Sequence, residues 1–149
     1  MVNKNLSNTE MVEILLIEDN KADILLMQKA LVKTDLKTSI TVIRNGDDAI
    51  KYLTNNIIEH NNIPNLILLD LNLPKKDGFE VLKEIKSNNN LKRIPVIILT
   101  ASSSKEDINK AYDMSANSYI VKPVKFRDFI LVVQRLKDFW VNTVELPNV

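Results

Sequence analysis

The sequence predicts a single doubly wound α/β domain, with a five-stranded parallel sheet covered by helices on both faces. Five short runs rich in Leu, Ile and Val mostly lack alternation, which is typical of strands buried on both sides. Segments with helical spacing separate these runs, and such alternation favours right-handed crossovers and a parallel sheet. The 149 residues suffice for one domain and contain no internal repeat or Pro/Gly-rich linker.

The strands are expected where the apolar runs lie. They are Glu13–Ile17, Ile40–Arg44, Leu66–Asp70, Val96–Thr100 and Tyr119–Val121.

The helices are expected between these runs and after the last one. The segment Lys21–Lys33 has apolar residues at helical spacing, and Asp47–Leu53 follows the turn Asn45-Gly46. A third helix after Gly78 carries Phe79, Leu82 and Ile85. Ser103 to Glu106 has the spacing of a capping box and predicts the start of a fourth helix. The longest helix is expected from Phe126 to about Trp140.

The composition is that of an ordinary globular protein, with 45% apolar and 26% charged residues. A net charge of +1, with acids and bases interspersed, gives no basic face for nucleic acid. The absence of cysteine excludes disulfides, thiol chemistry and Cys-ligated zinc. No apolar run approaches the ~20 residues of a membrane span, and the N-terminus lacks a signal-peptide core. We expect a cytoplasmic protein with a flexible segment at 1–12, a domain at 13–141 and a short tail at 142–149.

Polar residues of complementary chemistry follow four of the five strands. Glu18 and Asp19 come after the first, Asp70 ends the third, Thr100 ends the fourth, and Lys122 follows the fifth. A parallel sheet brings such residues together at its C-terminal edge. The acids supply hard oxygen ligands for Mg²⁺, while the lysine and the hydroxyl suit the oxygens of a phosphoryl group. The sequence therefore predicts a metal-assisted phosphoryl site beside a carboxylate.

These residues lie within longer motifs that together resemble the receiver domain of two-component response regulators, which has the CheY-like, flavodoxin-like (βα)5 fold. The motifs are Leu16-Ile17-Glu18-Asp19-Asn20, Leu68-Leu69-Asp70-Leu71-Asn72-Leu73-Pro74 with Asp77-Gly78, Leu99-Thr100-Ala101, and Tyr119-Ile120-Val121-Lys122-Pro123. The resemblance covers roughly Glu13 to Trp140. It implies a stand-alone signalling protein, not an enzyme, in which a histidine kinase transfers a phosphoryl group to Asp70 with Mg²⁺ or Mn²⁺.

The resemblance also implies a role for each site residue. The metal would be held by Glu18, Asp19, Asp70 and the main-chain carbonyl of Asn72. Thr100 would be the switch hydroxyl, Lys122 the phosphate-pairing lysine and Tyr119 the aromatic residue that moves with the switch. Asn72 and Ser102 would tune phosphoryl hydrolysis. One departure is Ser115, where many receivers have a glycine that serves a left-handed turn.

A narrower resemblance links the chain to the small regulators of bacterial phytochrome kinases. It rests on Glu18-Asp19-Asn20-Lys21-Ala22-Asp23, on Asp70 to Gly78, and on Asp138-Phe139-Trp140 followed by Leu146-Pro147. It implies a light-sensing histidine kinase as the phosphoryl donor.

The last helix has more apolar residues than one buried face needs. Phe126, Phe129, Ile130, Val133, Leu136 and Trp140 form one stripe at helical spacing and are expected in the core. Leu131, Val132 and Phe139 lie off that stripe. Either the terminal segment folds back on the domain, or this helix forms, with the fourth helix and the fifth strand, an interface for a homodimer or another partner. We favour the interface, formed by Val132, Phe139 and Trp140.

Other functions fit the residues less well. An aspartyl phosphatase would carry an acid where Asn72 stands, and flavin phosphate would be repelled by Glu18 and Asp19. With two glycines there is no Gly-rich ATP loop, and no residues remain for a helix-turn-helix. The lone His60 is expected in a solvated loop. A receiver-fold interaction module, or a phosphorelay shuttle without its own output, stays open as the alternative.

Overall fold

A computed structural model describes residues 11–32, 38–59 and 63–147. The expectations for His60 and for most of the N-terminal segment lie outside these residues. The elements are β1 (Val12–Ile17), α1 (Lys21–Val32), β2 (Thr38–Ile43), α2 (Gly46–Ile58), β3 (Leu66–Leu69), α3 (Gly78–Ser87), β4 (Val96–Thr100), α4 (Lys105–Asp113), β5 (Ser118–Val121) and α5 (Phe126–Trp140).

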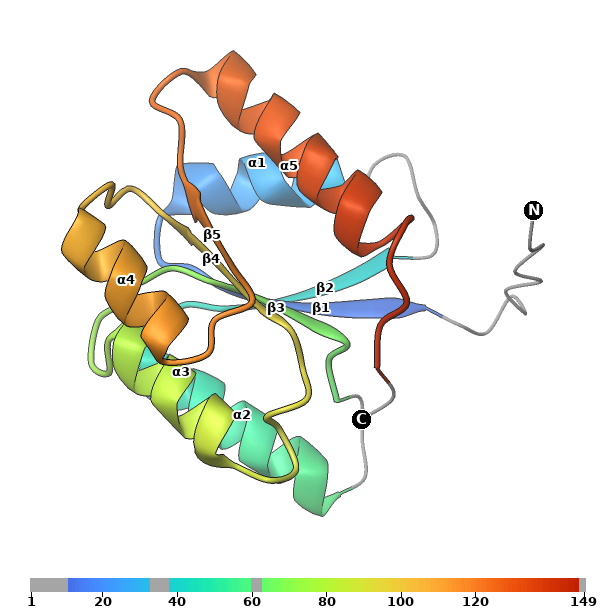
Figure 1. Cartoon of the computed structure of the whole chain (residues 1–149). Coiled ribbons are helices and arrows are strands. Elements are labelled where there is room, and N and C mark those ends of the chain that lie inside the picture. Colours follow the sequence, from blue (N-terminus) through green and yellow to red (C-terminus); the bar gives the residue numbers. More distant parts are fainter. Residues whose placement is uncertain (1–10, 33–37, 60–62, 148–149) are drawn as a thin grey trace.

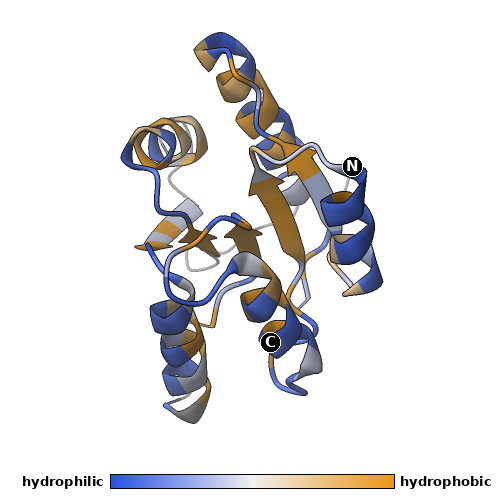
Figure 2. Cartoon of the chain, turned by 90° about the vertical axis from the view of Figure 1, so that its left-hand side faces the viewer, coloured by the Kyte–Doolittle hydropathy of each residue, from blue (hydrophilic) through white to orange (hydrophobic). Residues whose placement is uncertain are grey.

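The five strands form one parallel sheet in the order β2-β1-β3-β4-β5, so the predicted doubly wound α/β fold is confirmed. Helices α1 and α5 cover one face, and α2, α3 and α4 cover the other (Figure 1). The strands are the most apolar part of the chain and lie between helices that mix hydrophilic and hydrophobic residues (Figure 2). Because β1, β3 and β4 are covered on both faces, their side chains are almost entirely buried.

Two hydrophobic cores result, one on each face of the sheet. Leu15, Ile67 and Ile98 point to the core beneath α2, α3 and α4. Their alternating neighbours Leu16 and Leu68 point to the core beneath α1 and α5. The period-two geometry of a strand divides each continuous apolar run between the two cores.

The structure corrects several sequence-based boundaries. Helix α2 runs on to Ile58, beyond the expected end at Leu53. The N-cap of α4 is Ser104 rather than Ser103, because the Ser104 side chain accepts a hydrogen bond from the Asp107 backbone N–H. Among the described residues, no helix is long and apolar enough to cross a membrane.

The apolar stripe of α5 is only partly in the core. Phe129, Val133 and Leu136 are buried as expected, but Phe126 is 62% exposed. Phe126 was therefore wrongly expected in the core, since it is the first residue of a helix that begins at the carboxyl edge of the sheet. Phe139 is 53% exposed, and its ring meets Trp140 edge-on at 5.4 Å. Val132 and Trp140 are half-buried, and Trp140 packs against the core beneath α1 and α5.

Candidate functional site

The carboxyl ends of β1, β3, β4 and β5 meet at one edge of the sheet and carry the predicted polar residues. The parallel register places Ile17 beside Leu69 and Thr100 beside Val121. The residues that follow continue this pairing, because Asp70 N donates to Ile17 O at 3.0 Å and Lys122 N donates to Thr100 O at 2.7 Å. The sheet thus fixes the backbone beneath the site.

Lys122 lies at the centre of the site and binds three carboxylates. Its Nζ donates to Glu18 Oε1, to Asp23 Oδ2 at 2.9 Å and to Asp70 Oδ2 at 2.9 Å. Its side chain is only 8% exposed. Burial lowers the pKa of Lys122, but hydrogen bonds to the three carboxylates outweigh it and hold that pKa above its ordinary value. Lys122 is therefore a fixed positive charge.

Glu18 is the most deeply buried acid of the site. Besides Lys122 it binds its own backbone turn, because its Oε2 accepts from the N–H groups of Asp19 at 3.0 Å and Asn20 at 3.2 Å. Burial raises the pKa of Glu18 to about 7, against the opposing hydrogen bond from Lys122, and the neighbouring Asp70 adds to the rise. Glu18 consequently ionises near neutral pH.

Asp70 is held from both sides. Its Oδ2 accepts from Lys122, and its Oδ1 accepts from the backbone N–H of Asn72 at 3.1 Å. Burial would raise the pKa of Asp70, but hydrogen bonds with Glu18 and Lys122 outweigh it and leave that pKa below its ordinary value. Gly78 packs directly on this strand end, since a Cβ there would stand 2.4 Å from Asp70 O. Asp70 is thus an ionised carboxylate in a fixed position.

Thr100 brings a buried hydroxyl to the same edge. It is fully buried, and its Oγ1 has no hydrogen-bond partner of acceptable geometry among the described residues. It is nevertheless near enough to Asp70 to help lower the pKa of that carboxyl. An unpartnered buried donor is rare and costly, so it favours a site that a further oxygen atom completes.

An open hollow of about 530 Å³ adjoins the site. Its lining includes Asp19, Asn72, Asp77, Phe79 and Asp107. The Asp19 carboxylate therefore faces solvent beside the pocket, while its backbone carbonyl accepts from Arg44 Nη2 at 3.1 Å. The hollow gives a phosphoryl donor or an ion access to the edge of the sheet.

The site's charge suits a divalent cation, although its acids are not converged on one point. Glu18, Asp19, Asp23 and Asp70 outnumber the single ammonium of Lys122, and carboxylates are the ligands that Mg²⁺ prefers. Among the described residues, no three His, Cys, Asp or Glu side chains are placed to hold a metal. One reason is that Glu18 turns toward Lys122. The ligand set of Glu18, Asp19, Asp70 and the Asn72 carbonyl stays a prediction.

A hydrogen-bonded chain connects β5 to the loop before α4. The Tyr119 hydroxyl donates to Ser102 O at 2.9 Å, and the Ser102 hydroxyl donates to Asp107 Oδ2 at 2.6 Å. The Tyr119 backbone N–H in turn donates to the Tyr112 hydroxyl at 3.1 Å. Burial raises the pKa of Tyr119. Tyr119, the predicted switch residue, is therefore hydrogen-bonded to the loop that follows Thr100.

The sequence did not single out two acids that the structure places here, Asp23 and Asp107. Each lies in the first turn of a helix that begins at the carboxyl edge of the sheet. That shared position is a usable signal, because helices following parallel strands start at the same edge as the strand-end residues.

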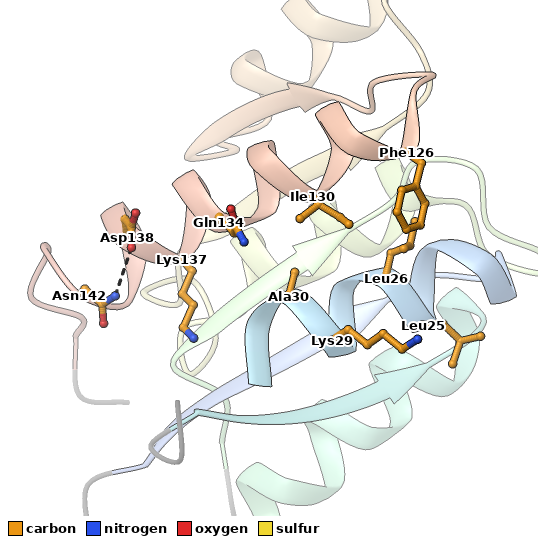
Figure 3. Close-up of a pocket in the computed structure, with 10 residues that line it drawn as sticks. All are labelled: Leu25, Leu26, Lys29, Ala30, Phe126, Ile130, Gln134, Lys137, Asp138 and Asn142. Carbon is orange, nitrogen blue, oxygen red and sulfur yellow. Dashed lines mark hydrogen bonds between the residues drawn. The ribbon is translucent and has the colours of Figure 1, made fainter. Parts of the chain in front are cut away.

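A second concave surface lies between α1 and α5. The groove has a volume of about 620 Å³. Figure 3 shows Phe126 above Leu26 at one end and Lys137, Asp138 and Asn142 at the other. The apolar end is formed by Phe126, the first residue of α5, and by Leu25 and Leu26 in the second turn of α1. Since both helices begin at the carboxyl edge of the sheet, this end lies on the same side as Asp70.

The fold and the site define a doubly wound α/β domain with an acidic, lysine-bearing pocket at the carboxyl edge of its sheet. The chain belongs to the response regulator receiver domain family, which matches residues 14–134. The family predicted from the motifs is thereby confirmed.

Individual relatives resemble almost the full chain. The response regulator Rcp1 of Synechocystis sp. is 45% identical over 135 residues, which cover 90% of this chain and 92% of Rcp1. The probable methanogenesis regulatory protein FilR2 of Methanothrix harundinacea is 40% identical over 135 residues, covering 91% of this chain and 87% of FilR2.

Two solved structures have the same fold. The Mn²⁺-bound form of Rcp1 superposes with a TM-score of 0.86 at 46% identity, covering 91% of this chain and 99% of that one. The phosphorylated cyanobacterial phytochrome response regulator RcpA gives a TM-score of 0.88 at 44% identity, covering 93% and 99%. The predicted similarity to small phytochrome regulators is confirmed.

Proposed function

We propose that this chain is a two-component response regulator in which Asp70 accepts a phosphoryl group from the phosphohistidine of a histidine kinase. The observation that carries the proposal is the pairing of the ionised Asp70 carboxylate with Lys122 at 2.9 Å, beside the unpartnered Thr100 hydroxyl. These are a nucleophile and two donors for phosphoryl oxygens.

The residues support an in-line transfer. A carboxylate oxygen of Asp70 forms a bond to phosphorus as the bond from phosphorus to the kinase histidine breaks. Lys122 offsets the charge on the phosphoryl oxygens, and Thr100 can turn its hydroxyl toward one of them. Mg²⁺ or Mn²⁺, held by Glu18, Asp19, Asp70 and the Asn72 carbonyl, would neutralise further charge on those oxygens. The Mn²⁺-bound structure of Rcp1 supports this choice of ion.

The lifetime of the phosphoryl group would be set beside the hollow. Asn72 lines the hollow, and Ser102 is held to Asp107, which lines it as well. These positions support the prediction that Asn72 and Ser102 control the approach of water to the phosphoaspartate.

The kinase proposed as donor is a phytochrome-type sensor. The support is the 44% identity to RcpA, a cyanobacterial phytochrome response regulator. The chain is also 40% identical to FilR2, a probable methanogenesis regulatory protein. Because these two relatives are named for different systems, a phosphoryl-transfer assay with purified kinases is the test of the donor.

We place the kinase on the apolar end of the groove between α1 and α5. Leu25 is 57% exposed and Phe126 is 62% exposed, although both side chains are apolar. Any kinase that brings its phosphohistidine to Asp70 must cover the adjoining surface, and exposed apolar residues there favour such contact.

The output is proposed to be a change of association through the face formed by α4, β5 and α5. Exposed apolar side chains on these elements include Tyr112, Val121, Leu131 and Phe139. The Tyr119 link to Ser102 connects this face to the site. A homodimer interface with Val132, Phe139 and Trp140 stays a prediction, which sedimentation of the unmodified and phosphorylated protein would test.

The experiment that tests the function is intact-mass spectrometry after incubation with acetyl phosphate and Mg²⁺. A single phosphoryl adduct is expected in the wild type and is expected to be absent from Asp70→Asn and from samples with EDTA. If the folded wild type forms no adduct with acetyl phosphate or with phosphorylated candidate kinases, the receiver-fold interaction module becomes the better account. An adduct that passes back to a second histidine protein would favour the phosphorelay shuttle.

A further inference from the structure

Asp23 binds Lys122 but has no part in the proposed phosphoryl transfer or metal binding. The Nζ of Lys122 has three N–H donors, and the structure uses all three, on Glu18, Asp70 and Asp23. Two of these acids follow sheet strands. Asp23 lies on α1, and its side chain is 22% exposed.

The position of Asp23 is fixed by the start of α1. Its backbone N–H donates to Asn20 Oδ1 at 3.0 Å, which caps the helix, and the Ile24 N–H donates to Asn20 O at 3.0 Å. Lys122, in contrast, reaches the site on a flexible four-carbon stem from the end of β5. The capped helix therefore supplies a rigid point against which the ammonium is held.

Phosphoryl transfer changes the other two partners of Lys122. When Asp70 becomes an acyl phosphate, its carboxyl loses its charge and gives up most of its attraction for the ammonium. Glu18 belongs to the predicted metal ligands, and a cation bound there would weaken the attraction of Glu18 for Lys122. Asp23 is the one carboxylate of the three that neither event removes.

We propose that Asp23 is a positioning residue for phosphoryl transfer, and that its carboxylate holds the Lys122 ammonium against the phosphoryl oxygens throughout the reaction. The inference rests on the proposed function of Asp70. Asp23 touches neither the phosphoryl group nor the metal; it acts through Lys122.

The matched variants are Asp23→Asn, Asp23→Glu and Asp128→Asn. Asp128 occupies the third position of α5, as Asp23 does in α1, and is exposed. At saturating Mg²⁺, we expect Asp23→Asn to lower the maximal rate of Asp70 phosphorylation by acetyl phosphate about tenfold, the effect of one lost charged hydrogen bond. The acetyl phosphate concentration at half-maximal rate should change little. Asp23→Glu should restore most of the rate, and Asp128→Asn should match the wild type.

A second readout does not depend on activity. An ammonium with three carboxylate partners exchanges its protons slowly, so we expect a Lys122 side-chain signal in ¹H–¹⁵N spectra of the metal-free wild type, assigned by its loss in Lys122→Gln. This signal should vanish in Asp23→Asn and persist in Asp128→Asn. Circular dichroism would verify that each variant is folded.

Three results would overturn the proposal: an unchanged maximal rate in Asp23→Asn, an equal loss of rate in Asp128→Asn, or an unchanged Lys122 signal in Asp23→Asn. If the wild type itself forms no adduct, the proposed function fails instead. The ammonium spectrum then decides by itself whether Asp23 holds Lys122.

Discussion

Glu18 and Asp70 bind the same lysine, and yet their pKa values are shifted in opposite directions. Burial raises the pKa of Glu18 to about 7, whereas hydrogen bonds with Glu18 and Lys122 keep that of Asp70 low despite burial. Two acids whose environments separate their pKa values can divide the tasks of a site. Asp70 remains the ionised nucleophile, and Glu18 is the acid whose charge depends on the surrounding pH.

The raised pKa of Glu18 predicts how the metal-free protein responds to pH. An acid with a higher pKa when folded stabilises the fold below its unfolded pKa, and that contribution is lost as pH rises toward the folded pKa. Urea denaturation in EDTA should therefore show the free energy of unfolding falling between pH 4.5 and about 7. Glu18→Gln should lack this fall. Parallel pH profiles for the two proteins would contradict the assignment.

The unpartnered hydroxyl of Thr100 predicts a conflict between stability and function. A buried polar group without a partner costs ~1–3 kcal/mol, so Thr100→Val should raise the free energy of unfolding by about 1 kcal/mol in urea. Phosphorylation of this variant should no longer change partner or dimer affinity.

Thr38 provides the matched control for Thr100→Val. Its Oγ1 is likewise buried without a partner among the described residues, but it lies at the opposite end of the sheet. Thr38→Val should gain similar stability and keep the response to phosphorylation. Loss of the response in both valine variants would show that Thr100 has no special role.

The site residues differed in how far the sequence could predict them. Asp70, Thr100 and Lys122 were predictable because a buried strand determines where the residues at its carboxyl end lie. The first-turn position of Asp23 indicates the correct edge of the sheet, but the sequence does not show that its side chain meets Lys122. The sequence shows that Thr100 brings a hydroxyl to the site. It does not show that this hydroxyl lacks a hydrogen-bond partner, because that depends on side-chain geometry.

Among the elements, β3, β4 and α5 were predicted closely, whereas the start of β2, the end of α2 and the N-cap of α4 were not. The ends of β3 and β4 follow from their apolar runs, whereas both Ser103 and Ser104 have the chemistry of an N-cap for α4. Ser104 takes the role because its backbone is extended and its hydroxyl receives the Asp107 N–H. The expected end of α2 at Leu53 was too early, because packing of Ile57 against the core extends the helix beyond it.

The loop after α4 has a left-handed residue without a glycine. Ser115 has φ of 72°, a conformation that costs a residue with a Cβ roughly 1–2 kcal/mol. We expect Ser115→Gly to raise the free energy of unfolding by up to about 1 kcal/mol, after allowance for the greater flexibility of glycine when unfolded. Chemical denaturation would measure this. Ser115→Ala, which keeps the Cβ, should give no gain; an equal gain would point to a cause other than backbone conformation.

The two glycines of the chain instead allow neighbouring backbone atoms to pack closely against them. Neither has a positive φ, but a Cβ on Gly46 would stand 1.9 Å from Lys76 O, and one on Gly78 would stand 2.4 Å from Asp70 O. Both hold the loop between β3 and α3 against its neighbours. The sequence marks these positions as turns without revealing this packing role.

Helix α5 carries an exposed aromatic residue near each of its ends. Phe126 begins the helix beside the phosphoryl site, and Phe139 lies near its end, more than three turns away. Both rings are more than half exposed. If the kinase covers the first and a second protomer covers the second, the two contacts should be separable by mutation.

Phe126→Glu and Leu25→Glu should therefore impair transfer from a phosphorylated histidine kinase by at least about tenfold, since exposed aromatic and aliphatic anchors commonly contribute more than 1 kcal/mol each to an interface. Acetyl phosphate should still modify both variants at the wild-type rate, because it needs only the pocket. Phe139→Glu should show the reverse pattern, with normal transfer and weakened self-association in sedimentation. If Phe139→Glu blocks transfer while Leu25→Glu and Phe126→Glu do not, the kinase binds elsewhere on α5.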